Sequence, residues 1–201
     1  MFSPDGRKAL SIGRNDSLTL WDVANGVKIR SFEIRRIIMG SYITTGDISG
    51  GTFSPNGRQV LFGSNDGALR LLDTASGAEV RVFGAGSAVG HQKRCAFSPD
   101  GRQILSAGND LLLWNVTSGA VIRSFQGHSA EVNACTFSPD GRHALSASDD
   151  CTLRLWNVAS GRELARWTTD TPLLCCAIGL DGETVIAGDN MGGLHFLSIV
   201  T

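Results

Sequence analysis

Hydrophobic and polar residues alternate over short stretches of the chain, and turn-forming residues separate these stretches. In the clearest region, VNACTFS, RHALSAS, CTLRLWNV and RELARW follow one another between residues 132 and 167. Each stretch has a period near two and is bounded by Gly, Asp or Ser, which is typical of β-strands. No window shows a long apolar period of 3.6 residues. The pattern therefore predicts an all-β chain.

A six-residue motif marks the period of this pattern. FSPDGR begins at residues 2, 97 and 137, FSPNGR at residue 53, and the fainter IGLDGE at residue 178, so successive copies are 51, 44, 40 and 41 residues apart. Pro presets φ, Asp bonds its own backbone and Gly accepts a left-handed conformation, so SPDG is typical of a hairpin turn. A period of about 40–45 residues with internal strands predicts four-stranded propeller blades.

The composition fits one packed domain, over residues 1–201, and speaks against several classes of protein. Of the 201 residues, 42% are hydrophobic and 18% charged, which is enough for a core and unlike a disordered segment. The formal net charge of −1 and the pI of about 6.4 lack the basic excess that neutralises nucleic-acid phosphates. No apolar run approaches the roughly 20 residues of a membrane span. We therefore expect neither nucleic-acid nor membrane binding.

The fourth copy of the repeat resembles a known family. Residues 127–161, GHSAEVNACTFSPDGRHALSASDDCTLRLWNVASG, are similar to a WD40 repeat from the Gly-His pair to the Trp-Asn that stands for Trp-Asp. The other units align with this one, and their motifs resemble the regular repeats of bacterial multidomain signalling proteins. The resemblance implies a WD40-type β-propeller of about five four-stranded blades, with units at residues 1–43, 44–87, 88–127, 128–168 and 169–201.

The resemblance also implies a hydrogen-bonded set of side chains in each blade. In the fourth unit this structural tetrad is His128, Ser146, Asp150 and Trp156. The other units keep parts of it: Ser11, Asn15 and Trp21; Asp66 and Leu72; Ser106, Asp110 and Trp114; and, in the fifth unit, Leu197 without a polar set. A Ser-His-Asp group also suggests a hydrolase, but the offsets recur as scaffold and no GxSxG elbow is present. We expect no catalytic residue and no cofactor.

Three of the five cysteines occupy one equivalent position. Cys95 and Cys135 lie two residues before the Phe of the motif, and Cys176 lies two residues before Ile178. A zinc site favours closely spaced ligands such as C-x₂-C, and we expect equivalent positions on neighbouring blades to diverge. We therefore predict buried packing thiols and no metal site. Free thiols suit a reducing compartment, which favours a cytoplasmic location.

Residues that the units do not share are the candidates for partner binding. The connection at residues 33–51 is about nine residues longer than its counterpart between Phe125 and Phe137, and it contains Arg35, Arg36 and Tyr42. By the family resemblance, further candidates surround the top of the channel: Asp47, His91, Lys93, Asn109, Glu131, Asn133 and Asp149. Arg and Tyr favour partner contacts. We predict a non-catalytic scaffold or sensor module that binds a protein or peptide.

Three alternatives stay open at this point. In the first, the connection at residues 33–51 is a solvated loop or an extra strand and binds nothing. In the second, the protein is a propeller enzyme with a metal at the channel mouth. In the third, it is a truncated propeller without activity of its own. The available metal ligands are Asp47, His91, Glu131 and Asp149. The first unit lacks most of an inner strand and the fifth lacks an outer one, so we expect a propeller incomplete at both ends. It would be a fragment of a larger propeller or would self-associate.

Overall fold

The computed structural model describes residues 1–13, 17–33, 48–64, 67–84 and 92–199. These residues form 18 strands in five antiparallel sheets. The first sheet contains β1 (Lys8–Ile12), β2 (Ser17–Asp22) and β3 (Lys28–Glu33), and the second contains β4 (Ile48–Phe53), β5 (Gln59–Ser64), β6 (Leu69–Asp73) and β7 (Glu79–Phe83). The third contains β8 (Gln92–Phe97), β9 (Gln103–Gly108), β10 (Leu111–Asn115) and β11 (Val121–Phe125). The fourth contains β12 (Val132–Phe137), β13 (His143–Ser148), β14 (Thr152–Asn157) and β15 (Glu163–Thr168), and the fifth contains β16 (Leu173–Ile178), β17 (Thr184–Asp189) and β18 (Leu194–Ser198).

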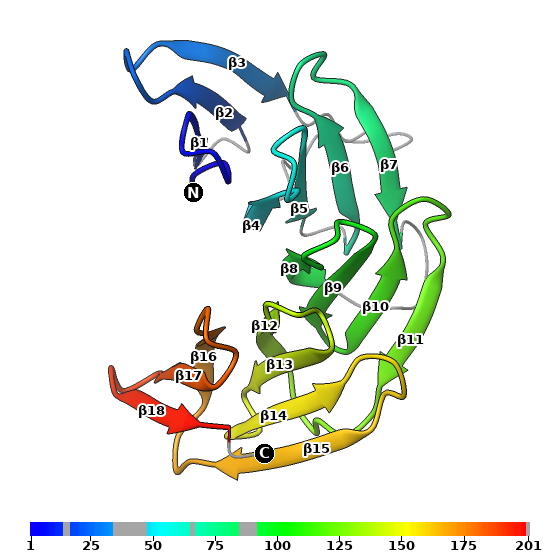
Figure 1. The fold of residues 1–201 in the computed structure, drawn as a ribbon, viewed down its shortest axis with the longest axis vertical. Helices are drawn as coiled ribbons and strands as arrows, with labels where there is room; N and C mark the ends of the chain where they lie inside the picture. Colours follow the sequence, from blue (N-terminus) through cyan, green and yellow to red (C-terminus); the bar gives the residue numbers. More distant parts are fainter. Residues whose placement is uncertain (14–16, 34–47, 65–66, 85–91, 200–201) are drawn as a thin grey trace, which may run out of the picture.

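The five sheets stand side by side around an open arc, with β4, β8, β12 and β16 on the inside (Figure 1). Strand order in each sheet follows chain order, as in propeller blades. The prediction of an all-β propeller with about five blades is therefore confirmed. The first sheet has no counterpart of β12, although Phe2 makes one isolated bridge to Ala9, and the fifth has no counterpart of β15 among the described residues. Within the described residues we find no helix of the length and apolarity needed to cross a membrane.

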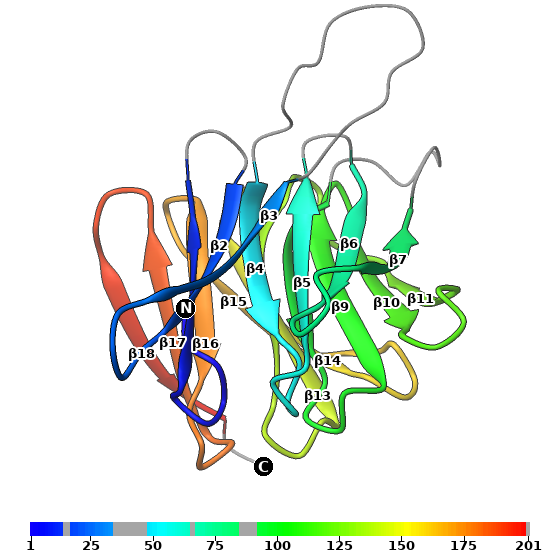
Figure 2. The ribbon, with the colours of Figure 1, turned by 90° about the horizontal axis from the view of Figure 1, so that it is seen from above.

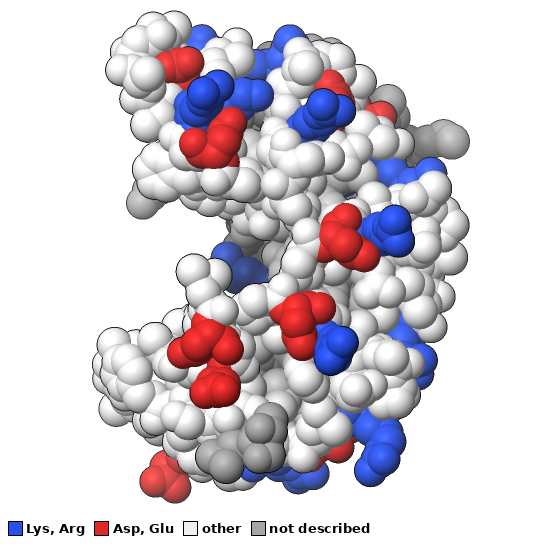
Figure 3. Space-filling model, viewed as in Figure 1, with Lys and Arg blue, Asp and Glu red and all other residues white. Residues whose placement is uncertain are grey.

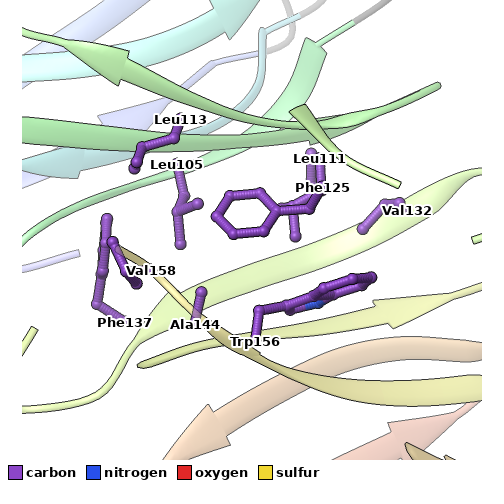
Figure 4. Close-up of a cluster of buried hydrophobic side chains, with 10 residues drawn as sticks. Leu105, Leu111, Leu113, Phe125, Val132, Phe137, Ala144, Trp156 and Val158 are labelled. Atoms are coloured by element: carbon purple, nitrogen blue, oxygen red, sulfur yellow. The ribbon is translucent and has the colours of Figure 1, made fainter. Parts of the chain in front are cut away.

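Hydrophobic side chains fill the space between adjacent sheets. The described residues contain four buried clusters, and each joins two neighbouring sheets. Figure 4 shows the cluster between the third and fourth sheets, where the ring centroids of Phe125 and Trp156 lie 5.6 Å apart. Because side chains alternate along a strand, Ala144 of β13 faces the third sheet and Leu145 faces the fifth. Each fully buried Leu or Phe contributes about 1.5–3 kcal/mol, so packing between sheets dominates the stability.

The FSPDGR motif forms the turn between the innermost strand and the next strand. Ser98 Oγ donates to Asp100 Oδ1 at 2.6 Å, and the amides of Arg102 and Gln103 donate to Asp100 and Ser98 at 3.0 and 2.9 Å. Gly101 has a φ of 70°, which glycine adopts readily. The same bonds recur around Asp5, Asn56 and Asp140. The motif recurs because every blade needs the same turn.

Candidate partner-binding surface

The FSPDGR turns lie at one edge of the sheets, together with the hairpins that bond to them such as β14–β15, and the β9–β10, β13–β14 and β17–β18 hairpins lie at the opposite edge. In Figure 2 the first turn lies at the lower edge and the β17–β18 hairpin at the upper edge. Five candidate partner-binding residues fall outside the described part of the chain: Arg35, Arg36, Tyr42, Asp47 and His91. For Lys93 the structure describes only its position in β8. Asn109, Glu131, Asn133 and Asp149 can be placed in full.

The structure brings three of these four residues together. The amide of Asp149 donates to the carbonyl of Glu131 at 2.9 Å. Asn133 Nδ2 donates to Asp149 Oδ1 at 2.6 Å and to the carbonyl of Leu173 at 3.0 Å. Asn133 therefore links the fourth sheet to the fifth, a structural contribution that its sequence position does not reveal. Asn109 lies in the equivalent hairpin of the third sheet and is exposed, as is Asp149.

Directly beneath the β13–β14 hairpin, the four tetrad side chains form one hydrogen-bonded chain. Trp156 Nε1 donates to Ser146 Oγ at 2.8 Å, and Ser146 Oγ lies 2.7 Å from His128 Nε2. His128 Nδ1 lies 2.8 Å from Asp150 Oδ2. Because an ionised carboxylate only accepts, Nδ1 carries the proton and Nε2 accepts from the serine hydroxyl. Every polar atom in the chain then has a partner.

Electrostatics hold Asp150 ionised and His128 neutral. Burial raises the pKa of Asp150, but hydrogen bonds from Thr152, His128 and the Ser129 amide outweigh it and bring the pKa well below the usual range. Burial lowers the pKa of His128, and the bond to Asp150 opposes this shift only in part. Ser146 is 0% exposed and already accepts from Trp156, so no substrate can reach it as a nucleophile.

The tetrad is part of a larger network that the sequence analysis missed. Arg154, only 5% exposed, donates through Nε to Thr152 Oγ1 at 3.0 Å and through Nη1 to Glu163 Oε2 at 2.8 Å. Its Nη2 lies 3.4 Å from Asp150 Oδ2. In the sequence, Arg154 alternates with Leu153 and Leu155, a pattern that indicates a solvent-facing position. Neighbouring sheets cover both faces of the fourth sheet, so Arg154 is buried as well as Leu153 and Leu155.

A second recurring contact, also missed, joins one blade to the next. Arg123 of β11 donates from Nη2 and Nη1 to the carbonyls of Ala159 and Ser160 at 2.8 and 3.0 Å. Equivalent bonds run from Arg30 to Ala75 and from Arg81 to Ser118, at 2.8 and 3.1 Å. We call this contact the arginine latch. Its sequence signal is an Arg two residues before the Phe at or near the end of β3, β7 and β11.

The interface between the fourth and fifth sheets has no arginine latch and contains a different contact. Ala165 stands where the other outer strands carry Arg, and the centroids of Trp167 and His195 lie 4.8 Å apart instead. His195 Nε2 lies 2.8 Å from Asp189 Oδ2. Leu197 does take the Trp position, where it pairs with Val185. The fifth unit was expected to keep no hydrogen-bonded polar residues, and this expectation was incomplete. The unit contains the pair Asp189 and His195, at positions that differ from those of the tetrad.

The equivalent cysteines lie closer together than expected. Cys95, Cys135 and Cys176 occupy neighbouring inner strands, and Cys95 and Cys176 both raise the pKa of Cys135 electrostatically. Burial is the larger cause for all three, raising the pKa of Cys95 and Cys176 to about 12. The expectation that these positions diverge was wrong, because inner strands converge on the channel. In the described part of the chain no three His, Cys, Asp or Glu side chains are grouped to hold a metal ion.

The radial sheets and the hydrogen-bonded tetrad define a repeat protein of the β-propeller class. Residues 119–157 match the model of the WD40 family, described as WD domain, G-beta repeat. The chain therefore contains a WD40 repeat, which confirms the resemblance seen in its sequence. Among curated proteins no match is found. WD40 repeats generally mediate protein–protein interaction.

Proposed function

We propose that this chain is a non-catalytic interaction module that binds a protein or peptide at the edge of the sheets opposite the FSPDGR turns. The observation that supports this most strongly is how the repeated polar residues are used. His128, Ser146 and Asp150 bond to one another and are buried, so they provide stability and leave no reactive group exposed. Exposed polar side chains such as Asn109 and Asp149 lie at the hairpin tips, where the blades differ from one another.

The charge distribution supports a polypeptide partner. Figure 3 shows the edge of the FSPDGR turns, opposite the proposed binding edge, and there acidic and basic side chains lie beside one another with no extended area of one sign. A nucleic acid would require a basic stripe. The candidate residues themselves combine both signs with amides, which suits the polar rim of a protein interface. The free cysteines favour a partner in a reducing compartment such as the cytoplasm.

Two sets of substitutions test the proposal on the intact chain. A partner is first captured by photo-cross-linking from a reactive group placed at residue 109, and its affinity is then measured by calorimetry. We expect Arg35→Ala, Arg36→Ala and Tyr42→Ala together to weaken binding at least tenfold, with the β-type circular dichroism unchanged. Replacing Arg102 and Arg142, in the FSPDGR turns at the opposite edge, removes a similar charge and serves as the matched control.

The outcomes separate the proposal from its alternatives. Loss of binding in the Asn109, Glu131 and Asp149 variants, with none in the Arg35, Arg36 and Tyr42 variant, would restrict the site to the two hairpins and the β11–β12 connection. Equal loss of affinity in the Arg102 and Arg142 variant would place the binding site at the edge of the FSPDGR turns. No partner at all would favour a propeller without independent activity. Stoichiometric metal in the purified protein, lost on replacing Glu131 or Asp149, would favour the enzyme alternative.

A further inference from the structure

A pocket of about 240 Å³ lies between the fourth and fifth sheets. Its walls come from both sheets, with β13, β14 and β15 on one side and β17 and β18 on the other. The apolar side chains that form most of these walls are Leu145, Leu153, Leu155, Trp167, Val185 and Leu197. The polar residues Arg166 and Ser198 also line the pocket, and both are exposed. The pocket therefore has an apolar interior and opens to solvent beside these two polar residues.

A change of residue in the fifth sheet accounts for part of this space. Leu197 stands where the fourth sheet has Trp156, since each pairs with the second residue of the preceding strand. Trp156 is 1% exposed, and its ring centroid lies 5.6 Å from that of Phe125 in the third sheet. A leucine side chain is smaller than an indole. Leu197 therefore leaves space between the fourth and fifth sheets that a ring occupies between the third and fourth.

The absence of the arginine latch accounts for the rest. Ala165 of β15 stands where β3, β7 and β11 carry the latch arginine, and it lines the pocket. The interface between the first and second sheets shows what losing the Trp alone does. There Leu72 takes the Trp position, Arg30 keeps its latch bond to Ala75 at 2.8 Å, and Leu72 is 6% exposed. Leu197, with no latch beside it, is only half-buried. We therefore attribute the pocket to both replacements together.

The walls of the pocket decide which kind of molecule it can hold. Leu145, Leu153 and Val185 are between 2% and 4% exposed, and their side chains carry no hydrogen-bonding group. A charged or unpaired polar group would lose its hydration against them without compensation. Arg166, beside the opening, already donates through Nε to Glu163 Oε1 at 2.9 Å, so the pocket does not call for an anionic group. A fitting molecule is apolar and uncharged.

We propose that this pocket binds one small uncharged aromatic molecule of one or two fused rings. An apolar cavity of about 150 Å³ can hold one benzene molecule. The pocket is larger, at about 240 Å³, and has room for a fused pair of rings. A flat ring is favoured because the matching space between the third and fourth sheets holds the indole of Trp156, and because Trp167 offers a ring to pack against. The bound molecule would join two sheets at an interface that lacks the arginine latch.

Titration of the full chain with indene, an uncharged hydrocarbon of two fused rings, tests the proposal. The chain has four tryptophans, and Trp167 is the one that lines the pocket. Its indole N–H resonance in a ¹H–¹⁵N spectrum is therefore a local probe, and the other three are internal controls. Indene is varied from about 0.05 to about 2 mM, because a ligand of this size should have a dissociation constant on the order of 0.1–1 mM. We expect a saturable shift of the Trp167 resonance and little change in the others.

Three variants show where indene binds. Leu197→Trp places an indole in the pocket and should weaken binding about tenfold or more. Leu197→Phe adds less volume, should also weaken binding, and serves if the larger side chain disturbs folding. Leu164→Trp adds the same indole to β15 at a position that is 49% exposed and outside the pocket, and it should bind indene like the wild type. Circular dichroism checks that the variants are folded.

Each other result overturns the proposal. A Trp167 resonance that does not move at the highest indene concentration shows that the pocket does not accept an aromatic ring. Unchanged binding in both Leu197 variants places the ligand elsewhere. Equal shifts of all four tryptophan resonances, or loss of binding in Leu164→Trp, show unspecific association with the surface. None of these results bears on the partner-binding edge, whose test uses other residues.

Discussion

The side chain of Arg123 crosses directly over Gly161 of the next blade. A Cβ placed on Gly161 would lie 2.6 Å from Arg123 Cδ and 3.0 Å from Nη1. The same relationship holds between Arg81 and Gly119 and between Arg30 and Gly77. Each of these glycines also has a positive φ, of 76 to 77°. The recurring turn glycine therefore meets two requirements, a left-handed backbone and room for the arginine latch.

Gly161→Ala should cost more stability than the same change at Gly26. Both glycines have a positive φ, 76° and 69°, which costs about 1–2 kcal/mol for an alanine. Only Gly161 lies under an arginine, whereas a Cβ on Gly26 meets nothing within 4 Å. We expect the difference between the two variants, measured by urea unfolding, to be about 1 kcal/mol.

A double-mutant cycle shows whether that difference comes from the latch. In an Arg123→Ala background, the added cost of Gly161→Ala should fall to the value seen at Gly26, because the obstructing side chain is gone. Full additivity of the two substitutions would mean that Arg123 and Gly161 do not interact. The arginine hydrogen bonds would then be incidental to the packing of the two blades.

His128→Ala should destabilise the protein by about 1–3 kcal/mol, because it leaves Ser146 and Asp150 buried without a partner. His143→Ala, in the half-buried first position of β13, is the matched control and should cost less than about 1 kcal/mol. Denaturant unfolding followed by tryptophan fluorescence measures both. Equal losses in the two variants would show that the tetrad contributes nothing beyond ordinary side-chain packing.

How much of this arrangement the sequence can show depends on the range of each contact. The FSPDGR turn and the alternating strands are local, so their residues specify them wherever they occur. The offsets of His128 and Asp150 follow from the family resemblance. Arg123 and Gly161 lie 38 residues apart and on different blades, so only the packing of the blades makes their contact visible. The same is true of the ring contact between Trp167 and His195.

Acid should weaken the fold in two steps, and His128 accounts for the first. Its pKa in the folded protein is lowered from 6.5 by burial, so the unfolded chain takes up this proton more readily. The contribution of neutral His128 is therefore complete above about pH 6.5 and is lost as the pH falls below that value. His128→Gln should flatten the dependence of unfolding free energy on pH between about 7 and 5. An unchanged slope would contradict the assignment.

Asp150 accounts for the second step. Its pKa is lowered from 3.8, so the carboxylate stabilises the fold above that value, and the contribution is lost as the pH falls further. Asp150→Asn should remove this part of the acid transition and destabilise the protein at neutral pH. Asp149→Asn, one residue away and exposed, is the matched control and should leave the acid transition in place.

The five thiols should differ sharply in reactivity. Burial raises the pKa of Cys95 and Cys176 to about 12, and that of Cys135 well above its usual value, so almost no thiolate is present at pH 8. Cys175, in β16, is exposed. Iodoacetamide should modify Cys175 within minutes and leave Cys95, Cys135 and Cys176 intact, as peptide mass spectrometry would show. The same reaction in urea should modify all of them. Rapid modification of Cys135 in the folded protein would contradict the packing of this side chain against the cluster between the third and fourth sheets.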